Sequence, residues 1–65
     1  MQVPRGVRES GENEFHGDGS KLEDAIHDAH EKAKGAGHRA YRVTEIYAWG
    51  ENPISGYRVI VAPVG

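Results

Sequence analysis

The sequence has no cysteine, so no disulfide can hold this chain of 65 residues together. It also lacks a charge bias, because eight Lys+Arg stand against ten Asp+Glu, and a nucleic-acid-binding protein usually carries a basic excess. No apolar run approaches the roughly 18 residues needed to span a membrane. The N-terminal MQVPRGVRESG has no apolar core of a secretory signal. Together with the missing cysteine, these features predict a cytoplasmic protein that binds neither nucleic acid nor membrane.

Large apolar residues are scarce as well. Only 37% of the residues are hydrophobic, and seven of these are alanines. Small chains without disulfides usually gain stability from a metal or from self-association. The length allows a single domain, which we expect over residues 12–65, while residues 1–11 are expected to form a flexible tail because Pro4, Gly6 and Gly11 interrupt any strand.

One helix is predicted in the first half of the chain. Gly17-Asp18-Gly19 is typical of a turn, and Ser20-Lys21-Leu22-Glu23 matches a capping box in which the Ser20 hydroxyl caps the helix. Gly35 and Gly37 can supply a left-handed stop. Apolar residues at helical spacing form one stripe that shrinks along the helix, and this predicts close packing on a sheet: Leu22, Ile26, Ala29 and Ala33.

Three strands are predicted, over residues 12–17, 40–49 and 54–62, and the last two are expected to pair as a hairpin. The chain is therefore predicted to be an α+β protein of β-α-β-β order, with a three-stranded antiparallel sheet packed on one helix. Strict alternation puts Tyr/Val residues on the helix side, together with Glu45 and Trp49. It puts the following residues on the opposite face, which we expect to pack on another copy of the chain: Arg42, Thr44, Ile46, Ala48, Arg58, Ile60 and Ala62.

Three stretches resemble the dodecins, a family of small strand–helix–strand–strand proteins that assemble as hollow dodecamers. SKLEDAIHDAHEKAKG resembles the family's helix, and YRVTEIYAW and GYRVIVAP resemble its last two strands. The resemblance covers residues 13–63 and implies a homo-oligomer, with a dodecamer as the family's form. Many dodecins also bind flavin, stacked on a tryptophan and hydrogen-bonded by a glutamine. Those positions hold Ala40 and Arg58 here, and residues 52–55 depart from the family's usual connection. The identity of any cofactor is therefore left open, with flavin as the one that the resemblance implies.

The candidate ligand-binding or interface residues are Arg42, Ile46, Trp49, Arg58 and Ile60. Trp49 stands at a strand end and is typical of an interface anchor. Arg42 and Arg58, on neighbouring strands, suit either an anionic ligand or an acidic group of another subunit.

No catalytic residue is predicted, since the chain has no cysteine, Ser20 is expected to be a cap, and Glu45 is the only acid in the middle of a strand. No metal site is predicted either. Four helix residues could approach a zinc ion, but they are more typical of a solvated polar face: Asp24, His27, His30 and Glu31.

These observations favour a non-catalytic, homo-oligomeric, dodecin-like protein that binds or stores a small molecule of unknown identity. The alternative is a small protein–protein interaction module that uses the exposed face of the sheet. A small enzyme is the weakest of the three hypotheses.

Overall fold

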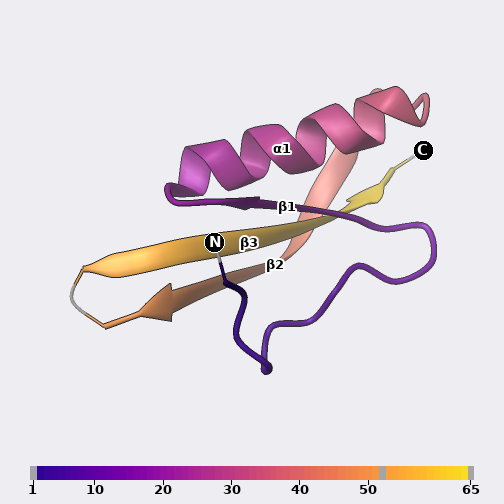
Figure 1. The fold of residues 1–65 in the computed structure, drawn as a ribbon. Coiled ribbons are helices and arrows are strands. Elements are labelled where there is room, and N and C mark those ends of the chain that lie inside the picture. Colours follow the sequence, from indigo (N-terminus) through magenta and orange to yellow (C-terminus); the bar gives the residue numbers. More distant parts are fainter. Residues whose placement is uncertain (1, 52, 65) are drawn as a thin grey trace.

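The computed structural model describes residues 2–51 and 53–64. Four elements follow one another along the chain: β1 (Phe15–Gly19), α1 (Leu22–Gly35), β2 (Tyr41–Gly50) and β3 (Ile54–Pro63). The strands form one antiparallel sheet in the order β1-β3-β2, and α1 packs on one face of it (Figure 1). The predicted α+β class and β-α-β-β order are confirmed. No helix in the described part of the chain is long and apolar enough to cross a membrane.

The core lies between α1 and the central strand β3. Three alanines of the helix, Ala25, Ala29 and Ala33, are completely buried against Val59 and Val61. Half-buried aromatic side chains surround this contact: Phe15, Tyr41 and Tyr57. Because alanine side chains are short, the helix can lie very close to the sheet.

The predicted apolar stripe is therefore correct for Ala29 and Ala33 but wrong for the larger residues. The buried face of α1 is centred on Ala29, and Leu22 and Ile26 lie toward one flank, where they are 37% and 41% exposed.

The segment expected to be a turn, Gly17-Asp18-Gly19, is instead part of β1. Gly17 allows the close approach of α1, since a Cβ atom there would lie 2.2 Å from the backbone nitrogen of Ala29. The strand thus ends later than predicted, and Ser20 falls outside the capping position. Lys21 is the N-cap residue and makes no side-chain capping bond, so the predicted Ser20 cap is wrong. The predicted left-handed stop is confirmed at Gly37, where φ is +94°.

A β-bulge at Thr44 inverts the second half of β2. Val43 lies opposite Val61 and Glu45 lies opposite Ile60, so β2 has one more residue than β3 over this interval. One extra residue turns every later side chain to the other face. Ile46, opposite Val59, therefore lies on the helix side with Ala48, and Trp49 lies on the far side with Glu45 and Tyr47. The alternation assumed from the sequence is wrong beyond Val43.

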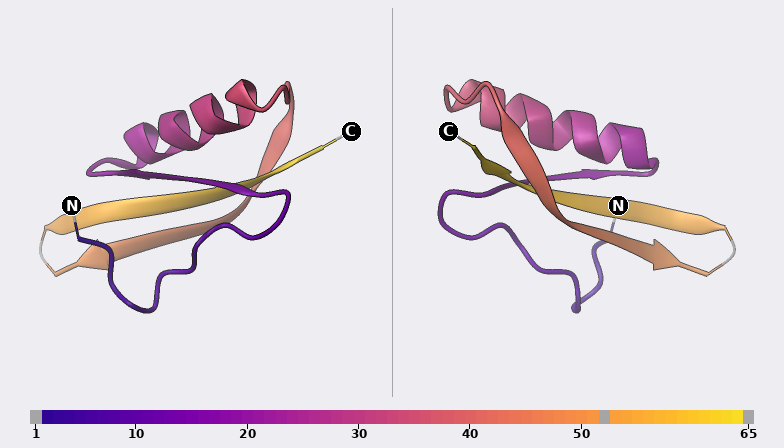
Figure 2. Two further views of the ribbon diagram at one scale, coloured as in Figure 1. Left: turned by 45° about the vertical axis from the view of Figure 1, so that its right-hand side comes forward. Right: turned by 180° about the vertical axis from the view of Figure 1, so that it is seen from behind.

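Residues 2–14, called the N-terminal strap below, run along the face of the sheet opposite α1 (Figures 1 and 2). Val3 and Val7 of the strap are half-buried. Ile60 points to this face and does not belong to the core under α1, yet it is 0% exposed. The face that the sequence led us to assign to a second copy is thus covered, at Ile60, within the chain itself.

Candidate functional site

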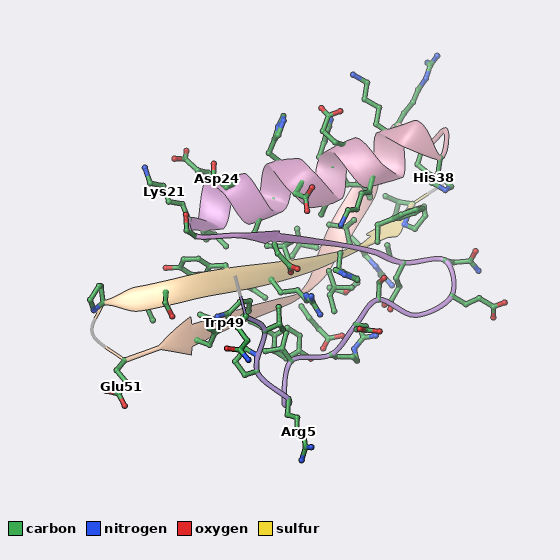
Figure 3. All side chains as sticks on the ribbon, viewed as in Figure 1. Arg5, Lys21, Asp24, His38, Trp49 and Glu51 are labelled. Atoms are coloured by element: carbon green, nitrogen blue, oxygen red, sulfur yellow. The ribbon has the colours of Figure 1, made fainter. Side chains whose placement is uncertain are left out.

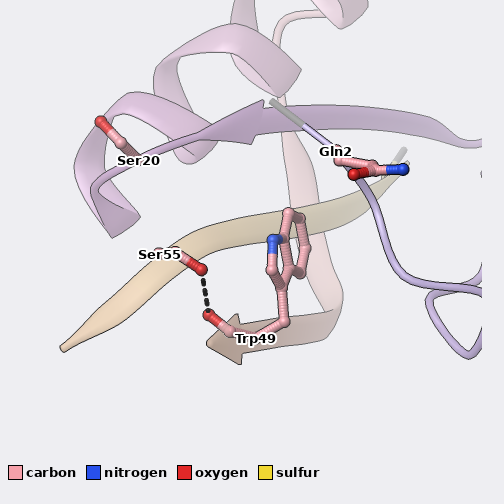
Figure 4. A pocket seen from close by; sticks show the side chains of 4 residues that line it. All are labelled: Gln2, Ser20, Trp49 and Ser55. Atoms are coloured by element: carbon pink, nitrogen blue, oxygen red, sulfur yellow. Dashed lines mark hydrogen bonds between the residues drawn. The ribbon is translucent and has the colours of Figure 1, made fainter. Parts of the chain in front are cut away.

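A pocket of about 540 Å³ lies beside Trp49, at the end of the β2–β3 hairpin (Figure 4). Gln2, Ser20 and Ser55 complete its lining, and the Ser55 hydroxyl donates to the Trp49 carbonyl oxygen over 3.3 Å. Trp49 lies directly opposite Gly56 in the sheet register, so no side chain of β3 competes for the space beside the indole ring. Among the described residues, the lining offers an aromatic surface, two hydroxyls and an amide but no charged side chain, which suits a neutral ligand with a flat apolar face.

Trp49 lies on the strap side of the sheet, whereas Lys21, at the start of α1, and Asp24, in its first turn, lie on the helix side (Figure 3). The strap contributes Gln2 to the pocket. The pocket is therefore built from residues at opposite ends of the sequence, and its shape depends on where the strap lies.

Arg58 and Asp18 form a two-pronged ion pair on the same face. The Arg58 Nε donates to Asp18 Oδ1 over 2.6 Å, and its Nη2 donates to Asp18 Oδ2 over 2.8 Å. The Arg58 side chain is only 7% exposed and that of Asp18 is 27% exposed. The hydrogen bonds from the guanidinium lower the pKa of the Asp18 carboxyl below its ordinary value, against the opposing effect of burial. With its charge already matched, Arg58 is a structural residue in the single chain.

Arg8 of the strap lies between two carboxylates. Its Nη1 donates to Glu14 Oε1 over 2.8 Å, and its Nη2 donates to Glu45 Oε2. Glu45 also accepts a bond from the Tyr47 hydroxyl. The hydrogen bonds from Arg8, and secondly from Tyr47, lower the pKa of Glu45, so this acid is ionised at neutral pH and is held by partners. Such a carboxylate is a poor general base.

On the helix side, α1 packs mainly on β1 and β3 and leaves most of β2 uncovered. The flank of α1 that faces β2 is identified by His30, whose ring meets Tyr41 edge-on with 5.2 Å between centroids. Ile26 lies on this flank, since it is one helical turn from His30. Two helix residues and two uncovered residues of β2 form what we call the open apolar patch: Leu22, Ile26, Val43 and Ile46, which are 37% to 55% exposed.

The structure separates the five candidate residues. Ile60 and Arg58 are buried, and Trp49 is half-buried beside the pocket. Ile46 is 55% exposed and lies on the opposite side of the sheet from the other four. The side chain of Arg42 is exposed and makes no hydrogen bond or ion pair with any residue that the structure describes. They do not form one site.

The polar helix residues also remain apart. His27 Nε2 lies 3.8 Å from Glu31 Oε1 on an exposed surface. Within residues 2–51 and 53–64, no three His, Asp or Glu side chains converge on a point where a metal ion could sit.

Sequence reasoning missed the bond that joins Ser10 of the strap to His16, and the pairing of Asp18 with Arg58. Asp18 was assigned to a turn and His16 was given no role. Asp18 and Arg58 lie 40 residues apart in the sequence, and the bond between Ser10 and His16 matches no helical or strand pattern, so no local signal revealed either contact.

The chain matches no family model, no curated protein and no solved structure. Function is therefore inferred below from the geometry of the chain itself.

Proposed function

We propose that this chain is the subunit of a non-catalytic, dodecin-like homo-oligomer that binds a small neutral molecule. The observation that carries the proposal is the open apolar patch. Leu22, Ile26, Val43 and Ile46 remain uncovered beside a core whose helical contribution is three alanines. A small domain gains much of its stability from burying such residues, and without disulfides a second copy is the simplest cover.

Charged side chains lie on both faces of the chain. Glu23 and Glu31 lie next to Ile26 on α1, whereas Arg42 projects from the opposite face of the sheet, without a partner among the described residues. A closed assembly in which each copy has neighbours on both faces can bring these opposite charges together. A dodecin-like arrangement agrees with the β-α-β-β order but is not specified by it.

The native mass tests this proposal. We expect light scattering after size exclusion to give an assembly, with about 85 kDa for a dodecamer of 7.1 kDa chains. Ile46→Lys should reduce the assembly to a folded monomer, because a charge placed in a buried contact lacks compensation while Ile46 is exposed in the single chain. Val64→Lys is the control, since Val64 is 51% exposed but lies outside the patch.

A folded wild-type chain that runs at 7 kDa would contradict self-assembly. The same patch would then favour the second candidate function, an interaction module whose apolar surface docks on a different protein.

The proposed binding of a small neutral molecule is tested separately, at the pocket beside Trp49. Riboflavin is a neutral ring compound, and its phosphate ester differs from it by an anionic group. Because none of the described residues that line the pocket carries a charged side chain, we expect riboflavin to quench the fluorescence of Trp49 more strongly than the ester does. Trp49→Leu should abolish riboflavin binding, measured through the ligand's own fluorescence, while Ile54→Leu at the same hairpin should retain it. Equal binding by the Trp49 variant would remove the pocket from the proposal.

A further inference from the structure

One contact between the N-terminal strap and the sheet is made by His16 of β1, and this contact requires one of the two ring nitrogens to be unprotonated. The backbone N–H of Ser10 donates to Nδ1 of His16 over 3.1 Å, and the Ser10 hydroxyl lies 2.8 Å from the same nitrogen. A backbone N–H can only donate, so Nδ1 must carry a free lone pair while this contact exists. Protonation of Nδ1 would place two donors face to face and break the contact.

His16 lies where a positive charge is disfavoured. It is half-buried on β1, and burial is the largest cause that lowers its pKa below the ordinary value of 6.5, followed by the charges of Arg58 and Lys32. Asp18 and Glu9 act in the opposite direction.

The surroundings of His16 can be traced element by element. Arg58 approaches from β3, and Lys32 from α1, where its Nζ donates to the His16 carbonyl oxygen over 2.9 Å. Glu9 and Arg8 lie on the strap, and Glu45 of β2 lies beyond Ile60 in the same row of the sheet. The nearby positive charges are held by the fold, so a proton on His16 is most easily accommodated when the ring leaves the strap and meets water.

The remaining polar contacts between the strap and the sheet are weak, because one is long and the other is exposed to solvent. Arg58 Nη1 donates to the Arg8 carbonyl oxygen over 3.4 Å, and the ion pair of Arg8 with Glu45 joins side chains that are 40% and 36% exposed. Exposed ion pairs contribute little to stability. The His16 contact is the one strap attachment in the described chain that depends on the protonation state of a histidine.

We propose that residues 2–14 form a pH-sensitive strap, closed over the sheet while His16 is neutral and released when His16 takes up a proton. Release uncovers Ile60 and Arg58 and withdraws Gln2 from the pocket beside Trp49. The proposal holds whether or not the chain assembles, since every contact it uses lies within one chain.

The pH range follows from the direction of the shift. A histidine that binds its proton more weakly in the closed form stabilises that form above pH 6.5, and this contribution is lost as the pH falls from there through the pKa of the closed form. Within that range the ratio of open to closed strap should rise by up to about tenfold per pH unit. Glu14 and Glu45 stay ionised in the upper part of the range, because their pKa values lie below the ordinary 4.5.

Nuclear magnetic resonance of the full chain tests the proposal. At pH 7.5 the ring nitrogen shifts of His16 should show Nδ1 unprotonated. Between pH 7.5 and 5 the amide signals of residues 2–11 should move together to the positions of a disordered chain, with the core amides of Val59 and Val61 unchanged. His16→Gln should remove this transition, because a glutamine carbonyl can accept the Ser10 N–H but does not titrate.

His27→Gln is the matched control, because the His27 side chain is 74% exposed and makes no strap contact, and it should behave as the wild type does. A proton on Nδ1 at pH 7.5, or strap signals that stay in place while the His16 ring titrates, would overturn the proposal even if the His16 variant failed to fold. A transition that persists unchanged in a folded His16→Gln chain would overturn it as well.

Discussion

Replacing Gly17 with alanine is expected to lower the free energy of unfolding by about 3 kcal/mol, at the upper end of what overpacking costs. A Cβ atom at Gly17 would lie 2.2 Å from the Ala29 nitrogen, 2.3 Å from the Ala25 oxygen and 2.9 Å from the Ala29 Cα. All three are backbone atoms of α1, so no side chain can move aside. The helix would have to leave the sheet and open the contact between its alanines and β3.

This loss is large for a chain of this size. Small domains are stable by about 0.05–0.15 kcal/mol per residue, or about 3–10 kcal/mol here. Urea denaturation followed by circular dichroism measures the change. Gly6→Ala is the control and should change the free energy of unfolding by less than about 0.5 kcal/mol, since nothing lies within 4 Å of the added atom. Equal stabilities of the two variants would show that α1 does not pack on β1 as closely as described.

The second large effect is expected when Asp18 is replaced by alanine. Arg58 would then keep its charge, with its side chain 7% exposed and its carboxylate partner gone. Breaking a fully buried pair costs about 3–5 kcal/mol. The 27% exposure of Asp18 admits water, so we expect a loss of about 2 kcal/mol at pH 7. The double variant with Arg58→Met should recover part of this loss, because it removes the unpaired charge.

The single variant Asp18→Ala should also change how the free energy of unfolding depends on pH in acid. The folded-state pKa of Asp18 is lowered, so its contribution is present above the ordinary value of 3.8 and is lost as the pH falls through the folded-state pKa. The wild type should therefore lose more stability than Asp18→Ala when the pH falls from 5 to 2. Glu12→Ala, an exposed acid of the strap, serves as the control. If Asp18→Ala retained the full acid dependence of the wild type, the pair with Arg58 would not be the cause.

The secondary structure was predictable from the sequence because its signals are local. Helical spacing of apolar residues and β-branched runs identified one helix and three strands, and the short connection identified the hairpin. The error in β1 arose because Gly17 and Gly19 are typical of turns, whereas here they make room for α1. Close approach of two elements is a tertiary requirement that no local pattern expresses.

The candidate site was less predictable, for two physical reasons. The bulge at Thr44 changed which β2 residues share a face, and no glycine or proline marks the bulge in the sequence. The strap covers Ile60 through contacts of long sequence separation, such as the bond from Arg58 to the Arg8 carbonyl. The composition of residues 1–11 suggested a flexible tail. In the structure, residues 2–11 run along the sheet (Figure 2).

The bulge at Thr44 also has an evolutionary consequence. Deleting Thr44 would remove the bulge and restore plain alternation with the rest of the register intact, so Glu45, Tyr47 and Trp49 would stay on the strap side and Ile46 and Ala48 on the helix side. A deletion further along β2, with the bulge kept, would instead turn every later side chain of the strand to the other face. Relatives can therefore gain or lose a residue at position 44 and keep the same binding surfaces, whereas a change of length elsewhere in β2 exchanges its aromatic and apolar surfaces.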